Sequence, residues 1–264
     1  MKMGSVAVGL VLATVPAMEV HAKVITQAVE YKHGDTPLIG YLAYDDAATG
    51  KRPGVLVVHE WWGLNDYAKK RTEMLAEMGY VAFAVDMYGK GVTAQNREEA
   101  QGLCTPVASD TALTRDRVRA GLDVLLKNDR VDTKRIAAIG YCFGGSTVLQ
   151  LAYSGADIAG VVSFHGGIQP PGEADLKNIK ARILICHGAD DPMIPSDQLQ
   201  AVQEGLRKAG ADWQLISYGR TVHSFTNPGA DKAGIDGLKY NPDSDRRSWA
   251  HMKLFFDELF GNSK

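Results

Sequence analysis

The pattern of hydrophobic and polar residues differs between the start of the chain and the part from residue 54 onward. Residues 24–31 and 38–44 have the pattern of two strands around the turn signal His33, Gly34 and Asp35, which predicts an antiparallel hairpin. From residue 54 onward, short apolar runs alternate with amphipathic stretches. The apolar runs predict strands at residues 54–59, 80–85, 135–141, 158–164, 182–186 and 213–218. The amphipathic stretches predict helices at residues 66–78, 114–127, 146–153, 196–208 and 246–260.

This alternation predicts an α/β fold. Strands that are apolar throughout are typical of a sheet covered on both faces, so we expect a mostly parallel central sheet with helices on each side. A chain of 264 residues is ordinary for one such domain, and neither a repeat nor a Pro-rich linker divides it. Residues 23–264 are therefore predicted to form a single α/β domain. In such sheets the ligand site forms at the carboxyl ends of the strands.

The first 22 residues carry a separate signal. Lys2 precedes the apolar stretch 6–15, which is followed by Pro16 and the small residue Ala22. This pattern resembles a secretory signal peptide cleaved after Ala22, and it predicts a periplasmic or secreted mature protein. The apolar run is too short to span a bilayer. The alternative is a cytoplasmic protein whose working start is Met18.

Charge and cysteine content narrow the class of partner. The formal net charge is −2 and charges of both signs are mixed along the chain, so neither nucleic acid nor a membrane surface is an expected partner. The densest basic cluster, Arg115, Arg117 and Arg119, is interrupted by Asp116 and is expected to lie on a solvated helix face. Three scattered cysteines do not form a disulfide framework or a zinc motif. A monomer without cofactor or metal is expected.

One cysteine lies where a nucleophile would be presented. The segment Gly-Tyr-Cys-Phe-Gly-Gly at 140–145 places Cys142 between glycines, at the junction of a predicted strand and a predicted helix. Small neighbours allow the tight strand-to-helix turn of a nucleophile elbow. The positive end of the helix would favour a thiolate, and its free amides could bind an oxyanion. The simpler reading is a buried cysteine that only packs.

Two further residues follow strands in the order expected of an α/β-hydrolase. Asp191 follows the run 182–186, and His223 follows the run 213–218. The chain order is therefore nucleophile, acid and histidine. His223 could accept the thiol proton of Cys142, and a carboxylate could fix its tautomer. Adjacent Asp190 and Asp191 cannot both face His223; we favour Asp191 and expect Asp190 to be a turn residue.

A fourth element follows the run 54–58. Glu60 would have its pKa raised by burial at the mouth of a pocket, where it could exchange a proton with a thiol. The backbone N–H of Trp61 would form an oxyanion hole together with that of Phe143. The neighbouring Trp62 could form a wall of the pocket. An exposed carboxylate and plain aromatic packing are the alternatives for these residues.

Taken together, these motifs resemble the dienelactone hydrolase family. The resemblance rests on the elbow at 140–145, His-Glu-Trp-Trp-Gly-Leu-Asn at 59–65, Asp-Met-Tyr at 86–88, Gly-Ala-Asp-Asp-Pro-Met-Ile-Pro at 188–195 and His-Ser-Phe at 223–225. It implies an α/β-hydrolase fold and a triad of Cys142, His223 and Asp191. It also implies that Glu60 takes the thiol proton when substrate binds, and that enol-lactones are opened through a thioester.

The sequence differs from the family at the two positions that bind the substrate carboxylate. Dienelactone-cleaving members grip the substrate carboxylate with two arginines, and the corresponding positions here hold Lys90 and Asn227. Lysine supplies only a point charge and asparagine supplies none. Dienelactone is therefore a poor candidate, although we still predict that Tyr88, Lys90, Asn227 and Trp62 bind the substrate.

The interpretation that follows is a thiol-dependent hydrolase of small carboxylic esters or lactones. A metal-dependent hydrolase is one alternative, because His59, His165 and His187 also end apolar runs and could meet Asp190 or Glu60 at a metal. The other alternative is a thiol or ligand-binding protein that kept the scaffold and lost turnover.

Overall fold

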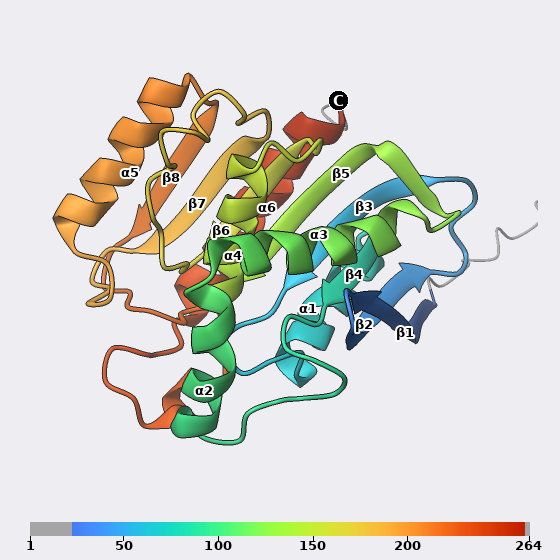
Figure 1. Cartoon of the computed structure of the whole chain (residues 1–264), viewed down its shortest axis with the longest axis horizontal. Coiled ribbons are helices and arrows are strands. Elements are labelled where there is room, and N and C mark those ends of the chain that lie inside the picture. The colour runs from blue at the N-terminus through green and yellow to red at the C-terminus, as the bar shows by residue number, and fades with distance from the viewer. Residues whose placement is uncertain (1–22, 262–264) are drawn as a thin grey trace, which may run out of the picture.

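An eight-stranded sheet runs through the centre of the molecule in the computed structural model, which describes residues 23–261 (Figure 1). The predicted leader, residues 1–22, lies outside the described residues. The strands are β1 (Val24–His33), β2 (Thr36–Asp45), β3 (Arg52–Val58), β4 (Val81–Val85), β5 (Val131–Tyr141), β6 (Gly160–Phe164), β7 (Arg182–Gly188) and β8 (Trp213–Tyr218). Their order across the sheet is β1-β2-β4-β3-β5-β6-β7-β8.

The sheet is mixed at one edge and parallel elsewhere. β1 pairs with β2 as the predicted hairpin, with Val24 opposite Asp45 and His33 opposite Thr36. β2 also runs antiparallel to β4, whereas every pairing from β4 to β8 is parallel. The prediction of a mostly parallel α/β-hydrolase sheet is thereby confirmed. Because the parallel strands share one direction, the residues that follow them meet at one edge.

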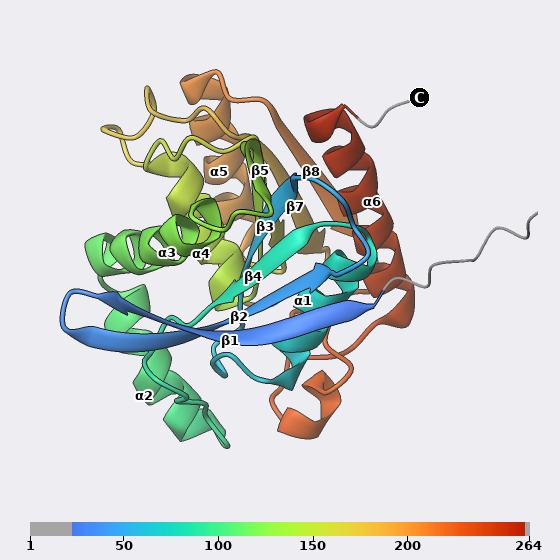
Figure 2. The same cartoon turned by 90° about the vertical axis from the view of Figure 1, so that its right-hand side faces the viewer.

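Helices cover both faces of the sheet (Figure 2). Helices α3, α4 and α5 lie on one side, and α1 and α6 lie on the other. Their bounds are α1 (Asp66–Glu77), α2 (Arg97–Ala108), α3 (Thr111–Leu126), α4 (Phe143–Tyr153), α5 (Ser196–Ala209) and α6 (Pro242–Phe260), with a short 3₁₀ turn η1 at Ala230–Ala233. In the described part of the chain, no helix has the length and apolar character needed to cross a membrane.

Two hydrophobic cores separate the sheet from its helices. One contains Leu56, Phe83 and Leu122 and lies under α3, α4 and α5; the other contains Tyr141, Phe164 and Phe256 and lies under α1 and α6. All six of these side chains are almost completely buried. Burying a large apolar side chain contributes about 1.5–3 kcal/mol, so both cores hold the strand ends firmly in register.

Several boundaries differ from the sequence-based prediction. Helix α2 was not predicted, because Gly102 and Pro106 interrupt its pattern. Helix α4 begins at Phe143 rather than at residue 146, so no loop separates Cys142 from the helix. Helix α6 begins at Pro242 rather than at residue 246, after the N-cap Asn241.

The arginines of α3 also do not form the solvated helix face that the sequence predicted. Arg117 is buried, and its Nη1 donates to the carbonyl of Met87 at 2.6 Å. Arg115 is half-buried and is paired with Asp175. The guanidinium groups therefore connect segments of the protein instead of facing water, as the long arginine side chain allows.

Candidate active site

Cys142 occupies a strained turn between β5 and α4. Its φ is 53° and its ψ is −115°, a backbone conformation that few non-glycine residues adopt. The turn is tight because strand and helix touch: a Cβ on Gly140 would lie 2.0 Å from the carbonyl oxygen of Gly144. Cys142 thus has the geometry of a nucleophile elbow. Its side chain stands at the N-terminus of α4, where the first amides have no intrahelical acceptor.

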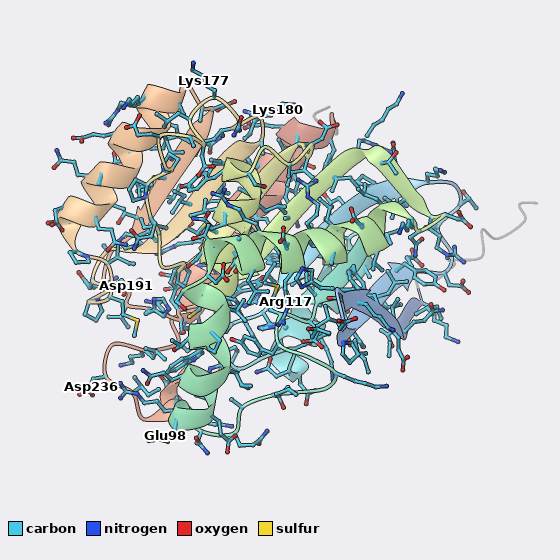
Figure 3. All side chains as sticks on the ribbon, viewed as in Figure 1. Glu98, Arg117, Lys177, Lys180, Asp191 and Asp236 are labelled. Atoms are coloured by element: carbon cyan, nitrogen blue, oxygen red, sulfur yellow. The ribbon has the colours of Figure 1, made fainter. Side chains whose placement is uncertain are left out.

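The structure brings Asp191 and His223 together. Asp191 follows β7 and His223 follows β8, and Asp191 Oδ2 lies 2.8 Å from His223 Nδ1. Both side chains are almost completely buried. The other carboxylate oxygen of Asp191 accepts the backbone N–H of Met193 at 2.9 Å. The neighbouring Asp190 is exposed and points elsewhere. Figure 3 shows Asp191 at the carboxyl end of the strands, the end at which α2 also lies.

The imidazole of His223 is set up to hold a proton. Burial opposes its charged form, but the negative charges of Cys142 and Asp191 and the hydrogen bond to Asp191 together raise the pKa of His223 to about 10. His223 Nε2 is buried and has no protein hydrogen-bond partner among the described residues. A buried nitrogen without a partner is costly, and here it is available for proton transfer to or from a bound molecule.

Glu60 lies beside this pair but is engaged by the loop that follows β8. Its side chain is buried, and it accepts hydrogen bonds from Ser224 Oγ at 3.1 Å and Asn227 Nδ2 at 2.5 Å. Burial raises the pKa of Glu60, although these two bonds and the charge of His223 work against the rise. The expected raised pKa is therefore present. The side-chain amide of Asn227 therefore has a partner within the protein, the carboxylate of Glu60.

His59 fixes the segment that carries Trp61. The backbone N–H of Met87 donates to His59 Nε2 at 3.2 Å, so the proton of the neutral ring lies on Nδ1 and is donated to the carbonyl of Glu60 at 2.5 Å. Burial lowers the pKa of His59 to about 4, which keeps the ring neutral. Tyr88 Oη donates to the carbonyl of Trp61 at 3.0 Å. The peptide groups next to the Trp61 N–H are thus held from two sides.

His165 contacts the backbone of the elbow itself. It follows β6 with a φ of 40°, and its Nδ1 accepts the backbone N–H of Cys142 at 3.1 Å. Its Nε2 lies 2.6 Å from Thr226 Oγ1, which in turn lies 2.6 Å from Tyr67 Oη. Burial lowers the pKa of His165 well below its usual value. The ring is therefore neutral, with its proton on Nε2.

Cys142 and His223 open onto one cavity of about 450 Å³. Its wall contains no Lys, Arg, Asp or Glu among the described residues. It is lined by Trp61, Cys104, Ala108, Thr111, Thr114, Cys142, Phe143, Ser146, Thr147, Gln150, Gly167, Gln169, Met193, Ile194, Gln198, His223 and Leu238. A pocket of this size, mostly apolar and with a few polar groups, suits a small organic molecule.

The predicted substrate-binding residues are spread over different surroundings. Lys90 is exposed, and its Nζ lies 3.3 Å from Glu30 on the neighbouring hairpin, so its charge is not part of the cavity wall. Trp62 packs edge-on against Trp61, behind the wall. Tyr88 stacks on Phe143, and Asn227 binds Glu60. Tyr88 therefore supports a residue of the wall, and neither Tyr88 nor Asn227 lines the cavity.

The histidines considered as metal ligands do not converge. Both ring nitrogens of His59 and both of His165 already have hydrogen-bond partners in the protein. Within residues 23–261, no three His, Cys, Asp or Glu side chains are grouped as a metal site would require. His187 is buried next to Asp191 and His223, and burial lowers its pKa.

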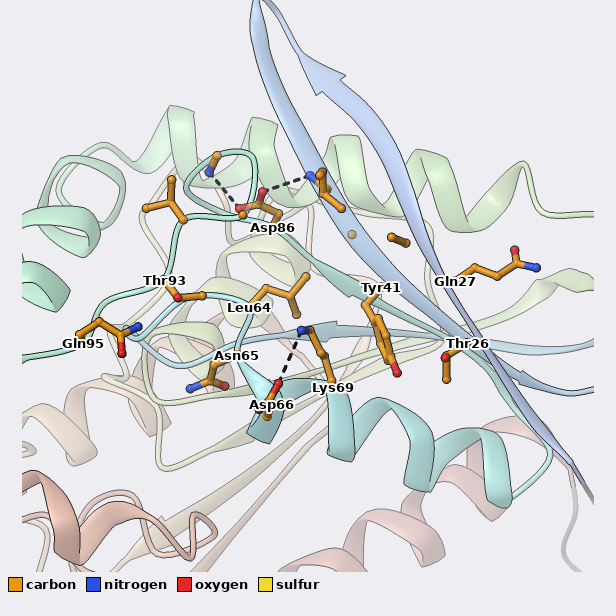
Figure 4. Close-up of a pocket in the computed structure, with 16 residues that line it drawn as sticks. Thr26, Gln27, Tyr41, Leu64, Asn65, Asp66, Lys69, Asp86, Thr93 and Gln95 are labelled. Carbon is orange, nitrogen blue, oxygen red and sulfur yellow. Dashed lines mark hydrogen bonds and ion pairs between the residues drawn. The ribbon is translucent and has the colours of Figure 1, made fainter.

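A second cavity, of about 530 Å³, lies between the β1–β2 hairpin and the start of α1 (Figure 4). Its charged groups are already engaged: Lys69 pairs with Asp66 at 3.6 Å, and Asp86 accepts the backbone N–H groups of Ile39, Tyr88 and Gly89. It contains neither Cys142 nor His223. Asp86 acts here as a structural acceptor that closes the turn after β4.

Several residues of the catalytic cavity were missed by the sequence interpretation. Cys104 and Ala108 come from α2, which was not predicted. Gln150 and Gln198 come from predicted helices, where a polar residue is normally assigned to the solvent-facing side. A signal was present for Gln150, because Cys142, Ser146 and Gln150 recur at a spacing of four and so share one helix face.

Comparison with known proteins places this geometry in context. The model of the dienelactone hydrolase family matches residues 38–260. A putative carboxymethylenebutenolidase of Aquifex aeolicus is 26% identical, over 87% of this chain and 97% of the relative. A crystal structure of a dienelactone hydrolase-like promiscuous phosphotriesterase from metagenomic libraries is 40% identical, with a TM-score of 0.87 over 89% of this chain and 98% of the other.

A more distant match extends the fold comparison. The acylaminoacyl peptidase of Pyrococcus horikoshii superposes with a TM-score of 0.65 at 16% identity, over 89% of this chain and 41% of that chain. At this identity the likeness concerns the α/β-hydrolase fold alone.

Proposed function

Because the chain belongs to the dienelactone hydrolase family, we propose that it hydrolyses uncharged carboxylic esters or lactones through a thioester on Cys142. One observation carries the proposal: Cys142 on its strained elbow and the buried, unpartnered Nε2 of His223 open onto the same cavity. A half-buried thiol and a buried base without other partners are expected where a substrate completes the site.

The reaction follows from the positions of these groups. The thiol proton passes to His223, and the Cys142 sulfur attacks the carbonyl carbon of the substrate. The backbone N–H groups of Trp61 and Phe143 would bind the oxygen as it becomes negative. The C–O bond then breaks and the leaving alkoxide takes the proton from His223. Water, deprotonated by His223, attacks the thioester and releases the acid and the thiol. Asp191 stabilises the charged imidazole throughout.

Glu60 has a second part in the proposal. Its buried carboxylate has a raised pKa and lies at the end of β3 beside the loop of His223. A substrate that disturbs its bonds to Ser224 and Asn227 would release it to take the thiol proton first and pass it on to His223, so that the thiolate forms in the complex. Substitution of Glu60 by Gln, which retains the shape of the side chain, should slow thioester formation more than thioester breakdown.

The substrate class follows from the cavity wall. The wall offers no Lys or Arg to a substrate carboxylate, its one basic group, His223, is already paired with Asp191, and Lys90 is paired with Glu30 outside the wall. A charged substrate would lose its hydration without gaining a partner. We therefore expect small aryl esters and neutral lactones to be preferred over the carboxylate-bearing dienelactone.

The test compares the wild type with Cys142→Ala and Cys104→Ser on a panel of small aryl esters and lactones. Cys104 lines the same cavity and is the matched control for a thiol. Cys142→Ala should lose at least about a thousandfold in kcat, whereas Cys104→Ser should stay within a few fold. Intact mass after rapid quenching should show an acyl adduct on the wild type alone. Full activity of Cys142→Ala would refute the proposal.

A second candidate activity is hydrolysis of neutral phosphotriesters. The 40% identical relative is described as a promiscuous phosphotriesterase, and a wall without Lys, Arg, Asp or Glu suits a neutral triester as well as a neutral ester. Release of p-nitrophenol from a dialkyl p-nitrophenyl phosphate by the wild type, and its loss in Cys142→Ala, would support this activity.

A further inference from the structure

Two glutamines in the cavity wall have one end of the amide fixed by the protein and the other end free. Gln150 lies on α4 and Gln198 on α5, and both are half-buried. The other half-buried or buried hydroxyl groups of the wall are already used: Ser146 donates to the carbonyl of Gly167, and Thr114 donates to that of Val107. Gln169 also lines the cavity but is exposed, so the free amide ends of Gln150 and Gln198 are half-buried polar groups that a bound molecule would meet inside it.

The chemistry of the partners fixes which end of Gln150 is free. Arg115 Nε and Nη2 lie 3.1 and 2.8 Å from Gln150 Oε1, and Arg115 also forms a two-point pair with Asp175, at 3.0 and 2.6 Å. A guanidinium can only donate, so the Gln150 atom beside it must be the oxygen. The amide nitrogen has no protein partner among the described residues, and it remains as a donor at the wall.

Gln198 is fixed in the opposite sense. Its amide nitrogen donates to the carbonyl of Ile168, which can only accept. Its oxygen has no protein partner within residues 23–261, and it remains as an acceptor at the wall. The segment 167–169 lies between the two helices, because Ser146 and Tyr153 of α4 bond its carbonyls from one side and Gln198 of α5 from the other.

The donor on Gln150 lies at a definite depth from Cys142. Cys142, Ser146 and Gln150 share one face of α4, and eight residues of helix correspond to about 12 Å along the axis. Side chains on a helix lean toward its N-terminus, so the Gln150 amide comes closer to the elbow than its Cα. A substrate arm of about six atoms would reach from the reacting carbonyl to the amide.

We propose that Gln150 and Gln198 determine specificity by recognising a hydroxyl group at the far end of one substrate arm. The hydroxyl oxygen accepts from Gln150 Nε2, and the hydroxyl proton is donated to Gln198 Oε1. This inference rests on the proposed function and names its substrate class: neutral esters or lactones with an arm of about six atoms that ends in a hydroxyl. Arg115, held by Asp175, is the positioning residue for Gln150.

The experiment measures kcat/KM for two matched ester series. In the first, the acyl arm of a p-nitrophenyl ester is hexanoate, ω-methoxyhexanoate or ω-hydroxyhexanoate. In the second, the hydroxyl lies on the alcohol arm, in acetate esters of hexanol and hexanediol, and acid release is followed. In one series the wild type should prefer the hydroxyl ester over the alkyl ester by about tenfold, and in the acyl series the methoxy ester should fall between.

Three variants test the contributions of the Gln150 and Gln198 amides separately, and a fourth variant is the control. Gln150→Met should abolish the preference for the methoxy ester, whereas Gln150→Glu, which still accepts from Arg115, should lose the methoxy preference but keep a hydroxyl preference. Gln198→Met should remove the advantage of hydroxyl over methoxy. Gln200→Met changes an exposed residue of α5 outside the cavity, and it should leave all ratios unchanged.

The outcomes are distinguishable from a failure of the proposed function. Equal rates for alkyl and hydroxyl esters in both series would overturn this inference while the hydrolase activity stands. So would a methoxy preference that survives Gln150→Met, or a preference of hydroxyl over methoxy that survives Gln198→Met. If the wild type hydrolyses no ester in either series, the proposed function fails and this inference fails with it.

Discussion

The backbone N–H of Cys142 is shared between the carbonyl of Phe164 at 3.0 Å and Nδ1 of His165 at 3.1 Å, so a buried neutral histidine accepts a hydrogen bond from the proposed nucleophile's own peptide group. The residue is held in a strained conformation, with φ at 53°, and strain of this kind persists only when the surroundings hold it in place. Thr226 Oγ1 fixes the other side of the ring. The arrangement makes His165 and Thr226 positioning residues for the elbow.

The first prediction concerns Thr226→Val, which keeps the shape of the side chain and removes the hydroxyl. His165 Nε2–H and Tyr67 Oη then lose a common partner in a buried site. An unsatisfied buried polar group costs about 1–3 kcal/mol, so the melting temperature should fall. If the elbow moves as well, kcat for an aryl ester should drop about tenfold with KM little changed. Thr226→Ser retains the hydroxyl and should restore both values.

The second prediction concerns Asp191→Asn and the protonation of His223. The Asp191 carboxylate supports the charged imidazole by its charge and its hydrogen bond, and it contributes to the rise of the His223 pKa to about 10. Asparagine provides a neutral amide, so the pKa of His223 should fall in the variant. NMR titration of the imidazole measures the pKa directly. The matched change Asp190→Asn, at an exposed carboxylate one residue away, should leave it unaltered.

The arrangement of this region could be predicted in part from the sequence. Uninterrupted apolar runs located the strands, and the residues that follow β5, β7 and β8 therefore fell at one edge of the sheet. The features that could not be predicted depend on side chains that contact residues far away in the sequence. Arg117 reads as a surface residue on a helix, but it reaches the carbonyl of Met87 behind β4. Lys90 reads as a substrate cation, but its Nζ pairs with Glu30, 60 positions earlier, and it does not line the cavity.

Helix α2 is an element of secondary structure that the sequence pattern could not predict. Gly102 and Pro106 lower the helix propensity of its 12 residues, and its buried face is small, with Ala100 and Val107. Tertiary packing and the N-cap Asn96 stabilise it, because the Asn96 side chain accepts the backbone N–H of Glu99 at 2.9 Å. The part of the cavity wall that α2 supplies was therefore not accessible to a pattern-based interpretation.

The third prediction concerns stability against pH. Burial lowers the pKa of His59 in the folded protein to about 4, whereas in the unfolded chain it is about 6.5. Between these values the unfolded state binds the proton and the folded state does not, so stability falls as the pH falls from about 6.5 toward 4. From about pH 7.5 to about pH 5, His59 should account for a loss of roughly 2 kcal/mol.

This contribution can be isolated with His59→Gln. His165 also has a lowered pKa and acts in the same direction, whereas the raised pKa of His223 acts in the opposite direction, and both contributions are common to the two proteins. The wild type should lose about 2 kcal/mol more than the variant between the two pH values in urea unfolding experiments. Parallel losses would mean that His59 is not held neutral, and would contradict the tautomer deduced from Met87 and Glu60.

The last prediction concerns the close approach that forms the elbow. A Cβ on Gly144 would lie 2.2 Å from the carbonyl oxygen of Val58 and 2.7 Å from that of His59, and neither backbone group can move without shifting the end of β3. Gly144→Ala should therefore displace α4 from the sheet, with a loss of several kcal/mol in stability, as for other overpacked positions. Because Val58 directly precedes His59 and Glu60, the same shift should disturb the oxyanion segment.

The matched control is Gly102→Ala in α2. A Cβ there meets nothing within 4 Å, and the residue is exposed in a helix, so alanine should raise stability by about 0.5–1 kcal/mol. Thermal unfolding should thus move in opposite directions for the two glycine-to-alanine changes, and any folded fraction of Gly144→Ala should show reduced alkylation of Cys142 by iodoacetamide. A Gly144→Ala protein with wild-type melting and wild-type esterase rates would show that the contact between α4 and β3 does not shape the elbow.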